Sequence, residues 1–477
     1  MPATQLPPNP LPRSTPTELG VSGSGVLAFL DAVAAVPDIE LHSLMVLRHG
    51  QVLAEGWWAP YGPPEIHLLY SLSKSFTSTA LGLAVGEGRL SLGDPVLAHF
   101  PEFEAEATHP WSRGMTVRQL VAMATGHHED TLERVRRLDP AEPVRGFLKV
   151  PPDEPPGTVF AYNNTATYVV GAIVQRLTGE TLTDYLRPRL FEPLGIDRAY
   201  WDGDRTGRDL GFTGLHLTTE AVARFGQLYL DDGVWQGTRL LPEGWVAEAT
   251  ALHTPNPNEP HPDWQQGYGY QFWQSRHGYR GDGAYGQFCL VLPEQDAVVV
   301  TTAATENMQG ILDAVWAELL PAFDAAGSFA DDQRLAARLT ALALPALDPA
   351  GQARWADTPG LEAHVEAVAV ADDDRGGWAL TVAERDQRLL VHCGDQEWAR
   401  TSVAVGDGRR LEVEASGLWV DPATFSAELI LVQTPHRLRV RFEPGTGRSA
   451  AWWVTGPPLR SPTLQGLATP VGVARRG

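Results

Sequence analysis

Residues 70–76 read Tyr-Ser-Leu-Ser-Lys-Ser-Phe, and they open the segment that decides the fold. Apolar residues recur over the following turns at a spacing near 3.6, which predicts a helix that packs one face against a core and ends near Gly86. In a helix that begins at Ser71, the side chains of Ser71 and Lys74 lie on one face, three residues apart and within reach of each other.

Lysine is almost absent from this chain. Lys74 and Lys149 are the only two lysines, so 35 of the 37 basic residues are arginine. A lysine can lose its proton near neutral pH when burial or a positive potential lowers its pKa, whereas a guanidinium group stays charged. The positive end of the helix favours both a neutral Lys74 and an oxyanion formed beside Ser71. The pair is therefore a candidate for a serine nucleophile activated by lysine; the alternative is a helix-capping Ser71 beside a solvated Lys74.

A second candidate element is Phe160-Ala161-Tyr162-Asn163-Asn164, which follows a Pro-Pro-Gly loop and precedes a helical pattern. Side chains at such a junction can project into a cleft. Tyr162 could pass a proton to a leaving group, with its phenol acidified by Lys74, and the Asn164 amide could hold a substrate carbonyl. The alternative is a core tyrosine next to a capping asparagine.

Together the two elements resemble the Ser-x-x-Lys and Tyr-x-Asn motifs of the serine β-lactamase-related hydrolases. This superfamily includes class C β-lactamases, D-alanyl-D-alanine peptidases, family VIII esterases and 6-aminohexanoate-dimer hydrolases. The resemblance runs from about Gly20 to Ala326. Within this range, three stretches besides the two motifs also resemble the family: Glu87–Val96, Phe191–Ile196 and Gly214–Leu228. It implies roles for four residues: Ser71 as the nucleophile, Lys74 as its base, Tyr162 as a general acid/base and Asn164 as a substrate-orienting group.

The same resemblance places the family's third motif, Lys-Thr-Gly or His-x-Gly, at Gly281-Asp282-Gly283. Gly281 stands where β-lactamases and peptidases carry a cation that helps to hold the substrate carboxylate, and Asp282 would repel a carboxylate. We therefore expect substrates without that carboxylate, such as esters, amides or amines, rather than penicillins or D-Ala-D-Ala peptides. Arg276 or Arg280 could partly substitute for the missing cation.

The resemblance further implies an oxyanion hole next to Gly283, formed by the backbone N–H groups of Ser71 and Ala284. Residues 281–286 also read G-x-G-x-x-G, but residues 287–292 predict a strand where a dinucleotide site needs a helix. No G-x-S-x-G stretch occurs, which argues against an α/β-hydrolase elbow.

Two other groups of residues are weaker candidates. His127-His128-Glu129-Asp130 resembles a metal cluster, but adjacent histidines point different ways and no H-E-x-x-H is present, so we expect a solvated loop near the mouth of the cleft. No metal or organic cofactor is implied. Seven aromatic residues could line an acyl pocket, with most of them simply in the core: Trp57, Trp58, Tyr61, Trp264, Tyr268, Tyr270 and Trp273.

The order of predicted elements indicates two domains. A strand hairpin around His49-Gly50, a helical middle and strands at 267–274, 287–292 and 297–302 predict an α+β domain, in which helices and a helical lobe flank a β-lactamase/transpeptidase-like antiparallel sheet. Later residues alternate with period 2, which predicts an antiparallel barrel or sandwich. The expected boundaries are an extended proline-rich arm over 1–19 that cannot bury much surface, a serine hydrolase domain over 20–326, a linker with a helix over 327–360 and a β domain over 361–477.

Composition narrows the possible partners. The chain has 477 residues, 43% of them hydrophobic, and a net charge of −21, so its acidic surface would repel nucleic acids and anionic membranes. Cys289 and Cys393 form neither a disulfide framework nor a metal spacing. Without a signal-like or membrane-spanning apolar run, we expect a cytoplasmic protein. The sequence leaves open the oligomeric state, the natural substrate and the role of the β domain.

These observations predict a serine hydrolase that cleaves a small-molecule ester or amide through a Ser71 acyl-enzyme. One alternative is a true β-lactamase or D-amino-acid peptidase. Another, from a different class, is an acyl-binding or scaffold protein that keeps the fold without turnover.

Overall fold

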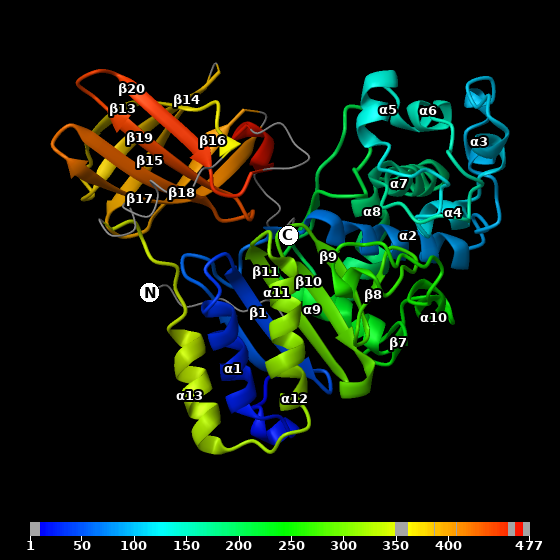
Figure 1. Ribbon diagram of the computed structural model, residues 1–477, viewed down its shortest axis with the longest axis horizontal. Helices are drawn as coiled ribbons and strands as arrows, with labels where there is room; N and C mark the ends of the chain where they lie inside the picture. Colours follow the sequence, from blue (N-terminus) through cyan, green and yellow to red (C-terminus); the bar gives the residue numbers. More distant parts are fainter. Residues whose placement is uncertain (1–9, 349–360, 386, 407, 457–462, 471–477) are drawn as a thin grey trace.

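The predicted hairpin begins the central sheet. In the computed structural model, which describes residues 10–348, 361–385, 387–406, 408–456 and 463–470 (Figure 1), β1 (Glu40–Arg48) pairs with β2 (Gln51–Trp57). The two turn residues, His49 and Gly50, have φ of 51° and 71°, as a tight hairpin turn requires. The sheet has six antiparallel strands in the order β2-β1-β11-β10-β9-β8; the later ones are β8 (Trp273–Gln274), β9 (Tyr279–Gly283), β10 (Gln287–Leu292) and β11 (Ala297–Ala304).

Helices cover both faces of this sheet. Alternate residues of β11 belong to two separate apolar clusters, with Val298 and Val300 in one and Val299 in the other, so the apolar run of this strand is buried on both sides. One face packs against α1 (Gly23–Ala34), α11 (Met308–Ala314), η8 (Val315–Leu319) and α12 (Leu320–Ala322), and the other against α9 (Thr219–Leu230). The helix α13 (Phe329–Thr340) lies along α1 and β2 (Figure 1).

A helical lobe lies beyond the β8 edge of the sheet and is centred on α2 (Ser73–Gly86) and α7 (Asn164–Thr178) (Figure 1). The other helices of this region are α3 (Pro110–Gly114), α4 (Val117–Val121), α5 (Leu132–Leu138), α6 (Pro143–Lys149), α8 (Leu182–Leu186), η5 (Arg187–Phe191) and α10 (Trp245–Ala249). Short strands join the loops: β3 (His67–Leu68), β4 (Tyr200–Trp201), β5 (Leu215–Leu217), β6 (Val234–Trp235) and β7 (Thr238–Arg239). The remaining short 3-10 turns are η1 (Thr17–Leu19), η2 (Tyr70–Leu72), η3 (Val96–His99), η4 (Pro101–Phe103), η6 (Pro262–Trp264) and η7 (Pro293–Gln295).

The predicted β domain is a curled ten-stranded sheet. Its strands pair antiparallel except for β15 and β17, which pair in parallel. Side chains such as Phe425 and Trp453 fill its core. The strands are β12 (Leu361–Glu362), β13 (Glu366–Asp372), β14 (Trp378–Glu384), β15 (Gln387–Asp395), β16 (Ala399–Val405), β17 (Arg409–Asp421), β18 (Thr424–Leu431), β19 (Arg437–Glu443), β20 (Arg448–Trp453) and β21 (Thr469–Pro470), with the 3-10 turn η9 (Gln465–Leu467) before β21.

Two expectations need correction. The strand predicted over 267–274 is reduced to the two residues of β8, because Gly267 and Gln271 take φ of 108° and 63° and interrupt the extended backbone. The arm was expected to bury little, yet Leu11 is buried and Arg13 forms ion pairs with Glu55 and Glu220. Residues 1–9 of the arm and 349–360 of the linker lie outside the described residues. Among those described, no helix is both long enough and apolar enough to cross a membrane.

Candidate active site

Ser71 and Lys74 meet at the start of α2. Ser71 lies in η2, one turn before the α-helix proper, and this junction leaves its side chain partly exposed while Lys74 is only 1% exposed. The Lys74 Nζ atom lies 2.9 Å from the Ser71 Oγ atom. The predicted pairing of the serine with the lysine is thus present as a direct hydrogen bond.

Two fixed acceptors orient the Lys74 amine. Nζ donates to Oδ1 of Asn164 at 2.7 Å and to the backbone carbonyl oxygen of Phe212 at 2.9 Å. Neither oxygen can donate a proton in return, so these contacts use two N–H bonds of the amine in every protonation state. The third tetrahedral position points at Ser71 Oγ, and it holds a proton in the ammonium form and the lone pair in the neutral amine. The neutral form is therefore aimed to accept the serine proton.

Burial makes this neutral form accessible. Loss of solvent lowers the pKa of Lys74 to about 7, although the negative charges of Asp130 and Asp282 act in the opposite direction. A lysine with an ordinary pKa of 10.5 would be almost fully charged at neutral pH, whereas Lys74 is about half neutral there.

We expect a pH profile controlled by Lys74. Because only the neutral amine can accept the serine proton, kcat/KM for an uncharged ester should rise about tenfold per pH unit below pH 7 and level off above it. The measurement is kcat/KM between pH 5 and pH 10. A rate that keeps climbing to pH 10 would show a lysine with an ordinary pKa and contradict this role.

Asn164 connects the lysine to a carboxylate that the sequence reasoning missed. Its Nδ2 atom donates to Oδ2 of Asp130 at 2.6 Å, and its backbone N–H donates to Oδ1 of Asp130 at 3.0 Å. The Asp130 carboxylate thus fixes which side of the amide faces Lys74. The two ends of the Asn164 amide thus join Asp130 to Lys74, so this side chain orients the amine.

Tyr162 lies beside the lysine with its ring rather than its hydroxyl facing the amine. Lys74 Nζ is 4.7 Å from the Tyr162 ring centroid. The ring stacks on Trp273 at 5.4 Å and meets Tyr268 edge-on at 6.2 Å. The expected acidification of this phenol is wrong: burial and the negative charge of Asp282 raise the pKa of Tyr162 above its ordinary value, so it remains a protonated donor at neutral pH.

Three of the seven aromatic candidates gather at this place. Trp273 contacts both Trp264 and Tyr268, and Phe160 adds a ring against Tyr268 and Trp273. Tyr61 instead stacks on His42, and Tyr270 packs on His253 and Arg118, both away from Ser71 contacts.

Strand β9 brings the third motif against the nucleophile turn. A Cβ atom at Gly283 would lie 2.0 Å from the carbonyl oxygen of Leu69, and one at Gly281 would lie 2.4 Å from Leu72 and 2.7 Å from Ser75. Only glycine permits this approach. The tight packing carries Ala284 to the side of the Ser71 turn, where the oxyanion hole is expected, and it leaves no room at Gly281 for the family's cationic side chain.

Neither arginine replaces that cation. Arg276 is held by the buried Asp263 at 2.8 Å and by Asp313. Arg280 is fully buried, pairs with Asp282 at 3.0 Å and donates to the carbonyl oxygens of Asp263 and Gln274. Asp282 is therefore compensated by Arg280, and its burial raises its pKa.

The residues on either side of the expected oxyanion hole have strained backbones. Tyr70, before Ser71, has φ of 48°, and Tyr285, after Ala284, has φ of 70°. A left-handed conformation costs a bulky residue about 1–3 kcal/mol, so surrounding contacts must hold it.

Comparison with known proteins places this site in a family. The model of the family described as Beta-lactamase matches residues 31–320, which is more than half of the chain and includes all the motif residues. The chain belongs to the beta-lactamase family.

This beta-lactamase-family protein is similar in sequence to two named bacterial proteins. It is 29% identical to the 6-aminohexanoate-dimer hydrolase of Paenarthrobacter ureafaciens over 62% of this chain and 84% of that one. It is 30% identical to penicillin-binding protein 4 of Amycolatopsis lactamdurans over 61% of this chain and 82% of that one. The crystal structure of SurE aligns with TM-score 0.50 at 21% identity over 90% of this chain and 98% of that one, so the fold resemblance extends into the β domain.

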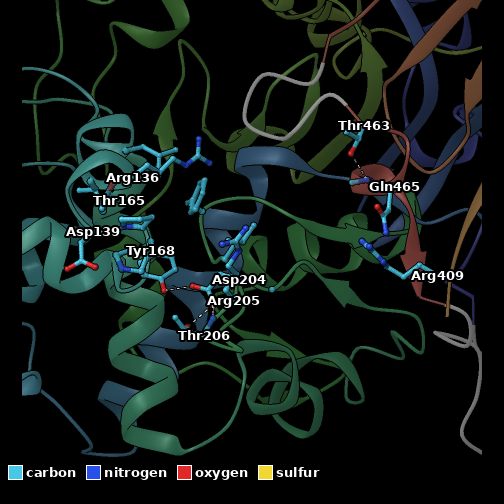
Figure 2. Close-up of a pocket in the computed structure, with 18 of the residues that line it drawn as sticks. Arg136, Asp139, Thr165, Tyr168, Asp204, Arg205, Thr206, Arg409, Thr463 and Gln465 are labelled. Atoms are coloured by element: carbon cyan, nitrogen blue, oxygen red, sulfur yellow. Dashed lines mark hydrogen bonds between the residues drawn. The ribbon is translucent and has the colours of Figure 1, made fainter. Parts of the chain in front are cut away.

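A cavity of about 890 Å³ lies between the helical lobe and the β domain, and Ser71, Lys74, Tyr162 and Asn164 are not among the residues that line it. Figure 2 shows Arg136, Thr165, Tyr168 and Arg205 on one side of it and Arg409 on the other. The β domain adds four more lining residues: Arg385, Thr463, Gln465 and Gly466. Phe212 lines this cavity and also contacts Lys74: its carbonyl oxygen accepts a hydrogen bond from Nζ, and its ring centroid lies 5.8 Å from Nζ.

The loop at 127–130 does not assemble a metal site. His127 is buried and bonds to Thr125 and to the carbonyl of Val150, while His128 is exposed. Within the described residues, no three His, Cys, Asp or Glu side chains are grouped so that they could hold a metal. Asp130 is the member of this loop that contributes to the site, through Asn164.

Proposed function

We propose that this protein is a serine hydrolase that cleaves an ester or amide through a Ser71 acyl-enzyme. Ser71 Oγ attacks the substrate carbonyl carbon while its proton passes to Lys74 Nζ. The bond to the leaving group then breaks, and the leaving oxygen or nitrogen takes a proton from the Lys74–Tyr162 pair. A water molecule then bonds to the acyl carbon as it gives a proton to Lys74, and Lys74 passes that proton to Ser71 Oγ as the bond between Oγ and the acyl carbon breaks.

The observation that carries this proposal is the arrangement around Lys74 Nζ. Two carbonyl oxygens bind Nζ, so that its third tetrahedral position points at Ser71 Oγ, 2.9 Å away. Burial lowers the pKa of Lys74 to about 7. A helix cap or a solvated lysine needs none of these features. They support a nucleophile and its base, and they argue against a protein that only binds acyl groups.

The third motif supports a substrate that lacks the carboxylate found in penicillins. Gly281 offers no cation, Asp282 is anionic, and Arg276 and Arg280 are both engaged elsewhere. We propose that the larger half of the substrate enters the cavity beyond Phe212. Its arginines would favour a polar or anionic end at that distance from the reacting carbonyl.

A substrate panel tests this proposal. We expect turnover of p-nitrophenyl butyrate and of a matching acyl anilide, and kcat/KM for nitrocefin and for a D-Ala-D-Ala peptide at least tenfold below that for the ester. Faster turnover of nitrocefin or the peptide would favour a β-lactamase or D-peptidase instead. A stable acyl-enzyme mass without product release would favour the acyl-binding protein.

A further inference from the structure

The two strained tyrosines beside the expected oxyanion hole are both held by the β domain. Tyr70 precedes Ser71 directly, and its hydroxyl lies 2.5 Å from Nε2 of His436, in the loop between β18 and β19. Tyr285 follows Ala284 directly, and its hydroxyl donates to the carbonyl oxygen of Gly456. The two backbone N–H groups implicated in oxyanion binding therefore each lie next to a residue anchored in the other domain.

The hydrogen-bond direction at His436 is determined by its second ring nitrogen. Nδ1 lies 2.7 Å from the carbonyl oxygen of Thr455, which can only accept, so Nδ1 carries the proton. Burial lowers the pKa of His436 to about 4, which leaves the ring neutral at pH 7. Nε2 is then an acceptor, and the Tyr70 hydroxyl donates to it. Thr455 and Gly456 are consecutive, so one short segment after β20 anchors both tyrosines.

The three side chains form one compact aromatic group. The rings of Tyr70 and Tyr285 meet edge-on with centroids 5.5 Å apart, and each meets the ring of His436, at 5.8 and 5.7 Å. All three are buried, with 1%, 8% and 0% of their surface exposed, respectively. Such a group resists rotation of any one ring, because its neighbours occupy the space that rotation requires.

The chain that leads into Ser71 is docked on the same domain. The backbone N–H of Leu68 donates to the carbonyl oxygen of Gln433 at 2.8 Å, and Glu65 pairs with Arg400 at 2.7 Å. On the neighbouring strand β1, Glu40 pairs with Arg437 at 2.6 Å. Several contacts therefore hold the segment before Ser71 and the nearby strand β1 against the β domain.

We propose that the β domain is a positioning element of the catalytic centre. Through His436 and Gly456 it holds Tyr70 and Tyr285 in their left-handed conformations, and it thereby fixes the backbone N–H groups of Ser71 and Ala284 for the oxyanion. This inference rests on the proposed serine hydrolase function and assigns that function a second, distant set of residues. The tyrosines and His436 are positioning residues, since they act through the backbone of their neighbours.

The test compares Tyr70→Phe and Tyr285→Phe with a matched control, Tyr61→Phe. Tyr61 also donates its hydroxyl to a backbone carbonyl of the β domain, that of Thr434 at 3.3 Å, but it is ten residues away from the nucleophile. We expect each of the first two changes to lower kcat for p-nitrophenyl butyrate and the rate of fluorophosphonate labelling at least tenfold, with KM within twofold. Tyr61→Phe should leave kcat, KM and the labelling rate within twofold of the wild type, even if its melting temperature falls as much as those of the other two variants.

A rescue pair tests the hydrogen bond itself. His436→Ala should lose activity as Tyr70→Phe does, whereas His436→Gln should recover part of it, because a glutamine amide oxygen can accept near the position of Nε2. Combining His436→Ala with Tyr70→Phe should cost little more than either change alone.

Hydrogen–deuterium exchange of peptides that contain Ser71 and Ala284 separates this proposal from the proposed function. Faster exchange at both places in Tyr70→Phe and Tyr285→Phe, but not in Tyr61→Phe, supports positioning by the β domain even if the wild type proves not to be a hydrolase. Unchanged exchange together with unchanged kcat would overturn it, and so would equal losses in all three variants that follow their melting temperatures.

Discussion

Ser71→Ala is expected to remove the fluorophosphonate adduct completely and to lower kcat by about 10⁴-fold or more, because the hydroxyl that donates its proton to the Lys74 lone pair is lost. Intact mass after incubation with the reagent, and ester turnover at pH 8, measure the two effects. The fold should persist, since Ser71 is partly exposed and alanine fits a helix start.

Ser78→Ala provides the matched control for this change. Ser78 lies on the same helix, and its buried hydroxyl has no hydrogen-bond partner among the described residues, so its removal should leave labelling and turnover intact. A single adduct that survives in Ser71→Ala would place the reactive group elsewhere and return Ser71 to a capping role.

Lys74→Arg is expected to abolish acylation, with a loss of about 10³-fold or more in kcat/KM. A guanidinium group cannot lose its proton near neutral pH, so it cannot accept the proton of Ser71 even where it reaches the same acceptors. Lys74→Met keeps the length of the side chain but removes the amine. If it loses activity as Lys74→Arg does, the larger size of arginine is not the cause of the loss. Acylation rates by stopped flow and circular dichroism spectra measure activity and fold.

The only other lysine offers the control. Lys149 ends α6, is 30% exposed and pairs with Asp139 at 3.3 Å and with Glu106 at 3.6 Å. Lys149→Arg keeps that charge and should keep full activity. Normal turnover in Lys74→Arg would overturn the role given to the lysine.

Local sequence patterns predicted much of the fold because they reflect local physics. The hairpin at His49-Gly50, the helix that ends at Gly86 and the strand Gln287–Leu292 occur where they were predicted, each from its own turn or its own pattern of apolar residues. The predicted strand over 267–274 failed because the left-handed conformations at Gly267 and Gln271 come from packing that no local period reveals.

The site was predictable where its groups share one turn of a helix, and less so where the fold brings them together. Ser71 and Lys74 belong to the first kind. Asp130 belongs to the second kind, since it lies 34 residues from its partner Asn164 in the sequence. The only sequence signal for Asp130 was its place in the loop at 127–130. The acidified phenol was expected from the nearness of Lys74 alone, whereas burial and Asp282 dominate the pKa of Tyr162.

The bond between Tyr70 and His436 also has a consequence for the order in which the molecule is made. Its two residues are 366 positions apart, so at ribosomal speeds of about 5–20 residues per second Tyr70 leaves the ribosome roughly 20–70 s before its partner exists. During that interval the nascent chain carries its nucleophile without the contacts that hold the adjoining turn. The turn that carries Ser71 therefore gains this support from the β domain only after residue 436 has been synthesised.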